Sequence, residues 1–330
     1  MTTLHALSIG QRQFPVNLIQ GPLAGVSSPP FRRLIWQHSR PAFSYTEMIS
    51  CKTLIHPSKI LHQRFTSKDV QEGPVCFQLS GKNPKELSEA ATIATDYGAD
   101  LIDLNCGCSV KKIRRKGTGS RLLDDLSHLY QLISALRKST SLPLLVKIRV
   151  GETEGFNREL AKVMSDAGAD AVVVHGRYWF ENYHTPCHLD EIRLFVDTLK
   201  IPVIGNGDVS DMASLQQMLS TGCAGVMIAR ASVGQPWLIR QLIAEINHEP
   251  FSIPTTPTIG ELFIEHVAQL AGFLGDESLA ILQARNLAPD YARCLQEDQA
   301  MLFCAEINAC DHFETFKKLC ARYFSYPFPR

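Results

Sequence analysis

A cysteine on a glycine turn, followed by a run of positive charge, is the first place where this sequence could do chemistry. Residues 103–109 read Asp-Leu-Asn-Cys-Gly-Cys-Ser, and the basic run 111–116 begins two residues later. A thiol at a strand end, close to dense positive charge, is suited to proton transfer or nucleophilic attack. The sequence therefore predicts reactive chemistry at this turn, and the other strand ends indicate which kind.

Polar residues, or residues that expose the backbone, follow each of the short apolar runs in the first part of the chain. They are Pro22, Leu23, Ala24, Thr46, Glu47, Met48, Gln78, Asn105, Cys108, Lys147, Arg149, His175, Gly176, Arg177, Asn206, Gly207, Asp208, Ala229 and Arg230. One such residue is weak evidence, because a lysine after an apolar strand is usually a solvated strand end. A complete set is hard to explain by stability alone. The pattern predicts one site that many strands build together.

Eight apolar runs must position these residues. They span residues 16–19, 42–45, 75–79, 101–104, 144–148, 171–174, 203–204 and 225–228. Nearly continuous apolar strands are typical of a parallel sheet that is buried on both faces. Helical patterns lie between most of them, at 84–97, 122–138, 157–167, 189–199 and 212–220. Strands and helices that alternate in this number predict an α/β fold, a (β/α)8 TIM barrel, with its active site at the carboxyl ends of the strands.

The main alternative is a doubly wound parallel sheet. That fold usually has fewer strands and a glycine-rich GxGxxG turn after its first strand. The corresponding turn here, residues 20–26, reads Gln-Gly-Pro-Leu-Ala-Gly-Val and lacks that spacing. The barrel is therefore the favoured architecture.

The last two strand ends predict a phosphate site. Gly207 leaves backbone N–H groups open, and Arg230 follows the final strand. Loops after the seventh and eighth strands of such barrels commonly bind phosphate. Gln78 and Lys147 would suit the polar edge of a flavin ring, where a lysine stabilises negative charge. The alternative reading of the last two strand ends is a turn glycine and a surface arginine.

Charge and composition divide the chain near residue 247. Of 33 basic and 33 acidic residues, 6 basic and 12 acidic ones lie at or beyond Glu245, so the tail is strongly acidic. The proline- and threonine-rich stretch 248–259 reads as a linker, and helical patterns follow at 261–275, 277–285 and 299–323. We expect a catalytic barrel over residues 1–247 and a small helical domain over residues 248–330.

Taken together, the motifs resemble the tRNA-dihydrouridine synthase family, whose members are FMN-binding barrels with an appended helical domain. The match runs in order from about residue 15 to 242. It rests on residues 21–26, 30–32, 46–48, 78–79, 103–108, 112–115, 147–149, 175–177, 204–208, 227–230 and 235–237. The basic stretch after the cysteine most resembles the bacterial B-type subfamily.

The resemblance implies a reaction on a uridine that is flipped out of tRNA, because a stacked base cannot meet a flavin. In the family, NADPH reduces FMN, hydride passes to C6 of the uracil, and a cysteine protonates C5. Cys108 aligns with that acid, and Asn105 would hold the uracil edge. Arg149 and Arg177 would contact flavin or base.

The resemblance also implies which residues hold the cofactor and the RNA. The FMN-binding residues are Pro22, Leu23, Ala24, Gln78, Lys147, His175, Asn206, Gly207, Asp208, Ala229 and Arg230. The basic residues Lys112, Arg114 and Arg115 would meet RNA phosphates, together with their lysine neighbours. Without the neighbouring cysteine, the basic run would instead read as a solvated loop.

The sequence departs from the family pattern near the reactive turn. Ser109 replaces a proline, which frees the backbone there. Cys106 is an additional thiol, and strict alternation along an extended segment would turn both cysteines the same way. Ala229 replaces a glycine at the phosphate site. The loop 178–187, which borders the base pocket, lacks the usual threonine and glycine.

The helical domain departs furthest from the family. Its Arg-Lys-His cluster with a following Trp-Tyr pair, which grips tRNA, corresponds here to residues 285–291. Only Arg285 and Tyr291 remain, and Pro289 is expected to break or kink the helix. Two other functions stay open: an FMN barrel that reduces another substrate, and a degenerate paralogue that binds RNA without turnover.

The remaining expectations concern the setting of the protein. Ten cysteines without a CxxC pair indicate free thiols in a reducing cytoplasm. The N-terminus lacks the pattern of a signal peptide, and no apolar run is long enough to span a membrane. We expect a monomer without a metal site, because the spacing of Cys304, Cys310, His312 and Cys320 fits no tight ligand pair.

Overall fold

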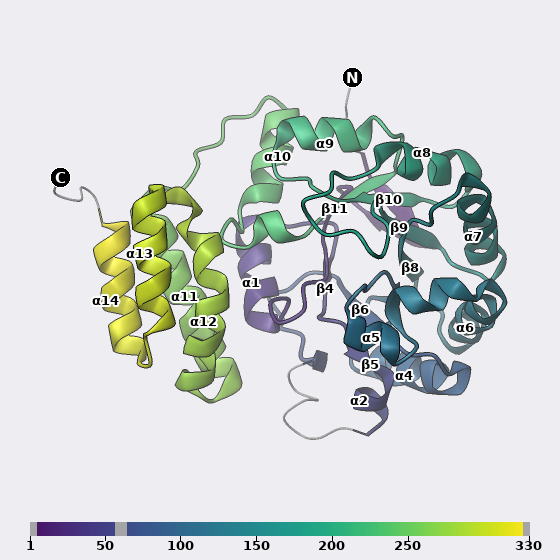
Figure 1. The fold of residues 1–330 in the computed structure, drawn as a ribbon, viewed down its shortest axis with the longest axis horizontal. Coiled ribbons are helices and arrows are strands. Elements are labelled where there is room, and N and C mark those ends of the chain that lie inside the picture. The colour runs from purple at the N-terminus through teal and green to yellow at the C-terminus, as the bar shows by residue number, and fades with distance from the viewer. Residues whose placement is uncertain (1–4, 57–64, 326–330) are drawn as a thin grey trace.

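The computed structural model describes residues 5–56 and 65–325 of the chain (Figure 1). The described part leaves out residues 1–4, 57–64 and 326–330. The start of the predicted barrel domain and the end of the predicted helical domain therefore lie outside it. Most of the N-terminal segment on which the absence of a signal peptide was predicted also lies outside it. In the described part, no helix has the length and apolar character needed to cross a membrane.

A closed parallel barrel of eight strands forms the larger part of the described chain. In chain order the strands are β3 (Leu18–Gln20), β4 (Ser44–Tyr45), β6 (Val75–Ser80), β7 (Leu101–Cys106), β8 (Leu144–Arg149), β9 (Ala171–His175), β10 (Val203–Asn206) and β11 (Gly225–Ile228). Neighbouring strands pair in parallel, and β3 closes the ring by pairing with both β4 and β11. A short strand, β5 (Ile49–Ser50), continues along β6 beyond β4. The predicted TIM barrel is confirmed, and each predicted strand overlaps an observed one.

Helices cover the outside of the barrel between successive strands (Figure 1). They are α1 (Pro29–His38), α2 (Cys51–Ile55), α4 (Pro84–Asp96), α6 (Leu126–Ser139), α7 (Glu154–Asp166), α8 (Leu189–Thr198), α9 (Met212–Leu219) and α10 (Leu238–Ile246). Side-chain caps fix where several begin, as when Asn83 accepts the N–H groups of Lys85 and Glu86 at the start of α4. The apolar faces of these helices and the outward side chains of the strands form one core.

A second apolar core fills the inside of the barrel, and an N-terminal hairpin closes it. The hairpin strands are β1 (Leu7–Ile9) and β2 (Arg12–Phe14), which pair antiparallel. Phe14 packs on Phe43, with ring centres 5.0 Å apart, among inward-facing residues of the barrel strands. The hairpin was not predicted, because its two strands are only three residues long.

The C-terminal region is a bundle of four helices beside the barrel (Figure 1). The helices are α11 (Thr256–Leu274), α12 (Glu277–Tyr291), α13 (Glu297–Asn308) and α14 (Phe313–Phe324). The single helical stretch predicted at 299–323 is wrong: the chain turns at residues 309–312 between α13 and α14. The linker is also shorter than predicted, because α11 begins at Thr256.

Pro289 lies inside α12 and does not break the helix at that position. Although proline lacks an N–H donor and its ring crowds the preceding turn, the helix continues to Tyr291 and is followed by a tighter turn over Ala292–Cys294. The expected break at Pro289 is therefore wrong, and the expected kink stays a prediction.

The bundle and the barrel share one apolar core. Phe31 on α1 and Trp237 before α10 belong to the same buried cluster as Phe263 and Tyr291 of the bundle. Because this core crosses residue 247, the division into domains at 247 and 248 stays a prediction.

Candidate active site

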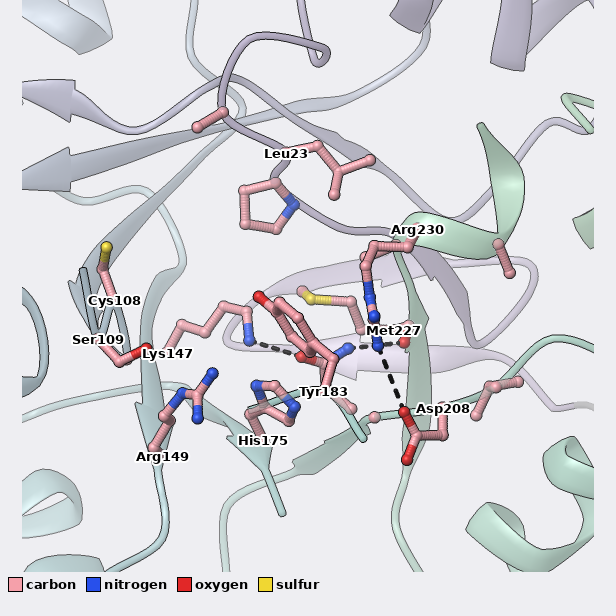
Figure 2. A pocket seen from close by; sticks show the side chains of 18 of the residues that line it. Leu23, Cys108, Ser109, Lys147, Arg149, His175, Tyr183, Asp208, Met227 and Arg230 are labelled. Carbon is pink, nitrogen blue, oxygen red and sulfur yellow. Dashed lines mark hydrogen bonds and ion pairs between the residues drawn. The ribbon is translucent and has the colours of Figure 1, made fainter. Parts of the chain in front are cut away.

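A cavity of about 740 Å³ opens at the carboxyl ends of the barrel strands (Figure 2). All eleven residues predicted to bind a cofactor line it, from Pro22 after β3 to Arg230 after β11. Cys108, Asn105 and Arg149 line it as well. The strand ends thus come together as the sequence pattern predicts. Figure 2 shows Cys108 on one side of the cavity and Arg230 on the other.

The backbone of Cys108 is held from two sides. Asn105 Oδ1 accepts the N–H of Cys108 at 3.0 Å and the N–H of Gly107 at 3.3 Å. The carbonyl of Cys108 accepts the N–H and the Oγ–H of Ser120, at 2.9 and 3.0 Å. These bonds fix the turn although Ser109 replaces the proline, so the thiol is presented to the cavity by a well-determined backbone.

The second thiol of this segment, Cys106, points away from the cavity. It is the last residue of β7, is completely buried, and packs in the core between strands and helices. The expectation that both cysteines face the same way is wrong, because the strand ends at Cys106 and the alternation stops there. Burial raises the pKa of the Cys106 thiol well above its ordinary value, which makes this group unreactive.

A buried chain of hydrogen bonds sets the orientation of Asn105. Asn105 Nδ2 donates to Gln78 Oε1 at 2.7 Å, and Gln78 Nε2 donates to Asp103 Oδ2 at 2.7 Å. Burial raises the pKa of the Asp103 carboxyl, while the hydrogen bond from Gln78 and the charge of Lys147 oppose this shift. The acidic end of the chain lies inside the barrel, below the cavity floor.

The cavity floor is formed by Lys147, His175 and Asn206. Lys147 Nζ donates to Asn206 Oδ1 at 2.7 Å, and Asn206 Nδ2 donates to the carbonyl of Met227 at 3.0 Å (Figure 2). Burial lowers the pKa of the Lys147 ammonium, and Asp103 counteracts this. Burial and the cations around it lower the pKa of His175 to about 2, so its imidazole is neutral. Arg177 Nη1 lies 3.1 Å from His175 Nε2, which assigns that nitrogen as the acceptor.

The turn after β10 has an unusual backbone. Gly207 has φ 139° and Asp208 has φ 54°, values that favour glycine at the first position and strain the second. The Asp208 carboxylate pairs with Arg177 and, at 3.4 Å, with Arg230. Residues 207–210 of this turn line the cavity.

Ala229, on the neighbouring strand end, replaces the family's glycine. Its φ is −123° and its ψ is −94°, and it lines the cavity beside Arg230.

Arg149 and Arg177 hold the loop 178–187. Arg149 Nη1 donates to the carbonyls of Tyr178 and Glu181 at 2.7 and 3.2 Å, and Arg177 Nε donates to the carbonyl of Thr185 at 2.6 Å. Arg177 is only 1% exposed and does not line the cavity. The basic residues Lys112, Arg114 and Arg115 lie on a short helix, α5 (Lys111–Arg115), outside the cavity.

Several residues of the cavity were not predicted from the sequence, and two of them, Tyr183 and Arg293, make contacts that shape it. Tyr183 lies in its centre, and the guanidinium of Arg230 stacks over the Tyr183 ring at 3.8 Å (Figure 2). Arg293 reaches the cavity from the helical bundle and donates to the carbonyls of Arg230 and Ala231, each at 3.4 Å. The aromatic run at 178–183 was a signal for the first, whereas no sequence pattern announces a contact between distant elements.

The two retained residues of the family's tRNA-binding cluster have internal partners. Arg285 donates to the carbonyl of Cys310 at 2.9 Å and pairs with Asp311 at 2.7 Å. Tyr291 is buried, and its hydroxyl lies 3.0 Å from His266 Nδ1. Both side chains therefore stabilise the bundle.

Comparison with known proteins identifies the family. The model of the family described as dihydrouridine synthase (Dus) matches residues 19–322. The chain belongs to the dihydrouridine synthase family. Members of this family are flavin-dependent oxidoreductases, so the family and the enzyme class predicted from the sequence are confirmed.

Named relatives of this dihydrouridine synthase cover most of its length. It is 31% identical over 288 residues to tRNA-dihydrouridine synthase B of Pasteurella multocida (strain Pm70), covering 86% of each chain. It is 33% identical over 274 residues to the protein of that name from Klebsiella pneumoniae, covering 82% of this chain and 84% of the relative. A solved structure of a variant of NCR from Zymomonas mobilis has a TM-score of 0.52 at 14% identity, covering 78% of this chain and 96% of the other, which shows likeness of fold alone.

Proposed function

We propose that this protein is an FMN-dependent tRNA-dihydrouridine synthase that uses NADPH to reduce the C5–C6 double bond of uridine in tRNA. The observation that carries the proposal is the arrangement of Cys108 and Arg230 at opposite sides of one cavity (Figure 2). The names of the B-type relatives support tRNA as the substrate.

The cavity residues fit an FMN group. A volume of about 740 Å³ is within the roughly 300–1,000 Å³ range of ligand sites. Among the described residues that line it, four are cationic and only Asp208 is anionic. Arg230 and the backbone of residues 207–210 would hold the phosphate, as loops at this end of TIM barrels do. The amide groups of Gln78 and Asn206 and the ammonium of Lys147 would contact the polar edge of the ring.

Cys108 would act as the general acid. When bound, reduced FMN supplies the hydride that adds to C6 of the uracil. The Cys108 thiol then gives its proton to C5, which completes the dihydrouracil, and the thiolate regains a proton from water. Asn105 positions this thiol through the backbone N–H of Cys108. Cys106 cannot replace it, because its thiol is buried outside the cavity.

The basic helix α5 would meet the tRNA backbone next to the cavity. Its residues Lys111, Lys112 and Arg115 follow the reactive turn within a few positions and would attract phosphates. The acidic bundle offers less attraction, so we propose that this enzyme relies on the barrel rim for much of its RNA affinity. We also propose that one chain acts alone in the cytoplasm, where free cysteines persist.

The proposal is tested by purifying the protein, recording its flavin spectrum, and incubating it with NADPH and unmodified tRNA. The expected results are a bound FMN and dihydrouridine in the digested tRNA. A colourless protein that cannot be reconstituted with FMN would contradict the cofactor assignment. Bound FMN without dihydrouridine in any tRNA would contradict the substrate.

A further inference from the structure

Two large aromatic side chains stand exposed beside the cavity. Trp179 is 42% exposed and Phe180 is 56% exposed, and both lie in the loop between β9 and α8. Side chains of this size are usually buried on folding, and adjacent exposed ones commonly mark a binding surface. Tyr183 of the same loop is also exposed and lines the cavity.

The exposed aromatic groups form an ordered cluster with an arginine from another element. The guanidinium of Arg114, on α5, lies 3.8 Å from the ring centre of Trp179. Phe180 meets Trp179 edge to face, with ring centres 5.7 Å apart and planes at 89°. Phe180 also stacks with Tyr178, which in turn stacks with His188. The result is a set of flat groups in contact, built from one loop and one short helix that are distant in sequence.

The loop is held in this shape by hydrogen bonds beneath it. Arg149 donates to the carbonyls of Tyr178 and Glu181, and the N–H of Tyr178 donates to the Glu181 carboxylate at 2.8 Å. Glu181 also pairs with His188 at 3.0 Å. Because the loop is tethered from below, the exposure of Trp179 and Phe180 does not result from a slack backbone. A rigid aromatic surface loses little conformational entropy on binding.

The cluster is connected to the backbone of the reactive turn. Arg114 Nη1 donates to Ser120 Oγ at 2.9 Å, and Ser120 Oγ donates to the carbonyl of Cys108 at 3.0 Å. The exposed Val110, which lines the cavity, directly precedes α5. The cluster therefore borders the side of the cavity that carries the thiol.

The α5 side of the cluster is basic, although Asp124 pairs with Arg114 at 3.4 Å. Lys111, Lys112, Arg115 and Lys116 lie beside Arg114 on and after α5. A ligand that offers both a flat π-face and nearby negative charge is a nucleotide of single-stranded or looped RNA. Aromatic rings and arginine planes stack on such unpaired bases, and lysines bind the phosphates between them.

We propose that Arg114, Trp179 and Phe180 form a stacking platform for an unpaired base of the RNA, adjacent to the uridine that enters the cavity. This inference rests on the proposed function and deepens it. The platform would hold the strand while the target base leaves its stack. Ser120, which bonds to both Arg114 and the carbonyl of Cys108, would fix the distance between the platform and the thiol. Its occupant is a base rather than an apolar peptide, because the arginine plane and the lysines favour an anionic partner.

The test combines fluorescence with binding and turnover in the flavin-loaded enzyme. Trp179 is one of three tryptophans in the chain, so a base that stacks on it should quench part of the emission. Trp179→Phe removes this signal and keeps an aromatic face. Trp179→Ala removes the face, and Arg114→Lys keeps the charge but not the plane. Tyr130→Ala is the matched control, since Tyr130 is a 44% exposed aromatic residue on α6 that does not line the cavity.

Stacking predicts that tRNA quenches the wild-type emission and leaves Trp179→Phe unchanged. It also predicts a Kd for tRNA raised roughly five- to a hundredfold by Trp179→Ala, with less loss in Trp179→Phe and none in Tyr130→Ala. The rate of flavin reduction by NADPH should stay constant in the two Trp179 variants and in Tyr130→Ala. An unchanged Kd and KM for tRNA in Trp179→Ala would overturn the platform while leaving the proposed function intact.

Two further measurements separate the platform from phosphate attraction and from the proposed function. Inorganic polyphosphate should not quench Trp179, and equal quenching by polyphosphate and by a uridine oligonucleotide would overturn stacking. If the wild-type enzyme produces no dihydrouridine, the proposed function fails, but quenching of the tryptophan emission by the uridine oligonucleotide still tests the stacking platform. Quenching by the oligonucleotide that disappears in Trp179→Phe supports the platform. Absence of such quenching in the wild type overturns the platform.

Discussion

The side-chain oxygen of Asn105 accepts the backbone N–H of Cys108 at 3.0 Å, so the residue that is expected to hold the uracil edge also places the thiol. The same amide group is oriented by Gln78, which is in turn bonded to Asp103. The position of the reactive turn is therefore set from inside the barrel, by β6 and β7.

Replacement of Asn105 should reduce the chemical step more than flavin binding. In Asn105→Ala the turn loses its two N–H bonds, and the thiol is no longer held against the cavity. We expect kcat for tRNA reduction to fall by on the order of a hundredfold, as for other small misplacements of a reacting group. Flavin content should stay near that of the wild type. Single-turnover oxidation of the reduced enzyme by tRNA measures this step, and an unchanged rate would exclude the positioning role.

The two cysteines of the turn give a matched pair of variants. Cys108→Ala should lower dihydrouridine formation by about 10²- to 10⁴-fold, the usual contribution of a general acid. Cys106→Ala should leave the rate nearly unchanged and cost some stability, because it opens a small gap in the core between strands and helices. Quantification of dihydrouridine and urea unfolding of both variants check this pair. Equal losses of rate in the two variants would contradict the assignment of Cys108.

The charge of Asp103 should set the pH at which Lys147 loses its proton. The negative charge of Asp103 raises the pKa of Lys147 against the lowering caused by burial. Asp103→Asn removes that charge, so the ammonium should lose its proton at a lower pH. If the ammonium supports the negatively charged reduced flavin, the alkaline limb of the rate of flavin reduction moves to lower pH in the variant. The pH profile of NADPH oxidation measures the shift, and a shift to higher pH would be the opposite of the prediction.

The residues at the strand ends could be predicted because a buried strand is apolar, whereas a residue of the site that follows it is usually polar or charged. A run such as Leu144–Val146 is apolar because both faces are covered, and Lys147 then stands out against it. The register of a parallel barrel brings such residues to one end, so cavity residues from Pro22 to Arg230 could be anticipated without any contact information.

Contacts between distant elements could not be predicted in the same way. Arg177 has the sequence position of a site residue, but its guanidinium lies under the loop and pairs with Asp208. Arg293 lies far along the chain in an acidic segment, yet it reaches the cavity through the turn after α12. The direction of the Arg177 side chain and the docking of the bundle decide which of these two arginines reaches the cavity. Neither property produces a periodic pattern in the sequence.

His175 should remain neutral throughout the physiological pH range. Because its folded pKa is lowered to about 2, its contribution to stability is present above the ordinary value near 6.5 and is lost as pH falls toward the folded pKa. Stability relative to His175→Asn should therefore drop by about 2 kcal/mol between pH 6.5 and pH 5. Urea unfolding at the two pH values measures the drop. NMR of labelled histidine, with the His175 signal assigned by its absence from His175→Asn, should show that this imidazole does not titrate between the two pH values. Titration of this signal near pH 6 would refute the prediction.

Gly234 should be essential for the seating of the helical bundle on the barrel. It lies after the turn that follows β11 and has φ 74°, and a Cβ at this position would lie 2.4 Å from the carbonyl oxygen of Asp290. Both the backbone conformation and the lack of space oppose a side chain, so Gly234→Ala should destabilise the protein by about 1–3 kcal/mol. The variant should also displace Arg293 and weaken flavin binding.

Gly272→Ala is the matched control. Gly272 lies in α11, and no described atom of a neighbouring residue stands within 4 Å of the position that a Cβ would take there. Alanine should therefore stabilise that helix by roughly 0.5–1 kcal/mol. Urea unfolding and flavin titration of both variants show whether the loss of stability and flavin binding is specific to the contact at Gly234 or follows any replacement of a glycine. Equal stability of both variants would show that the bundle tolerates a shift at this contact.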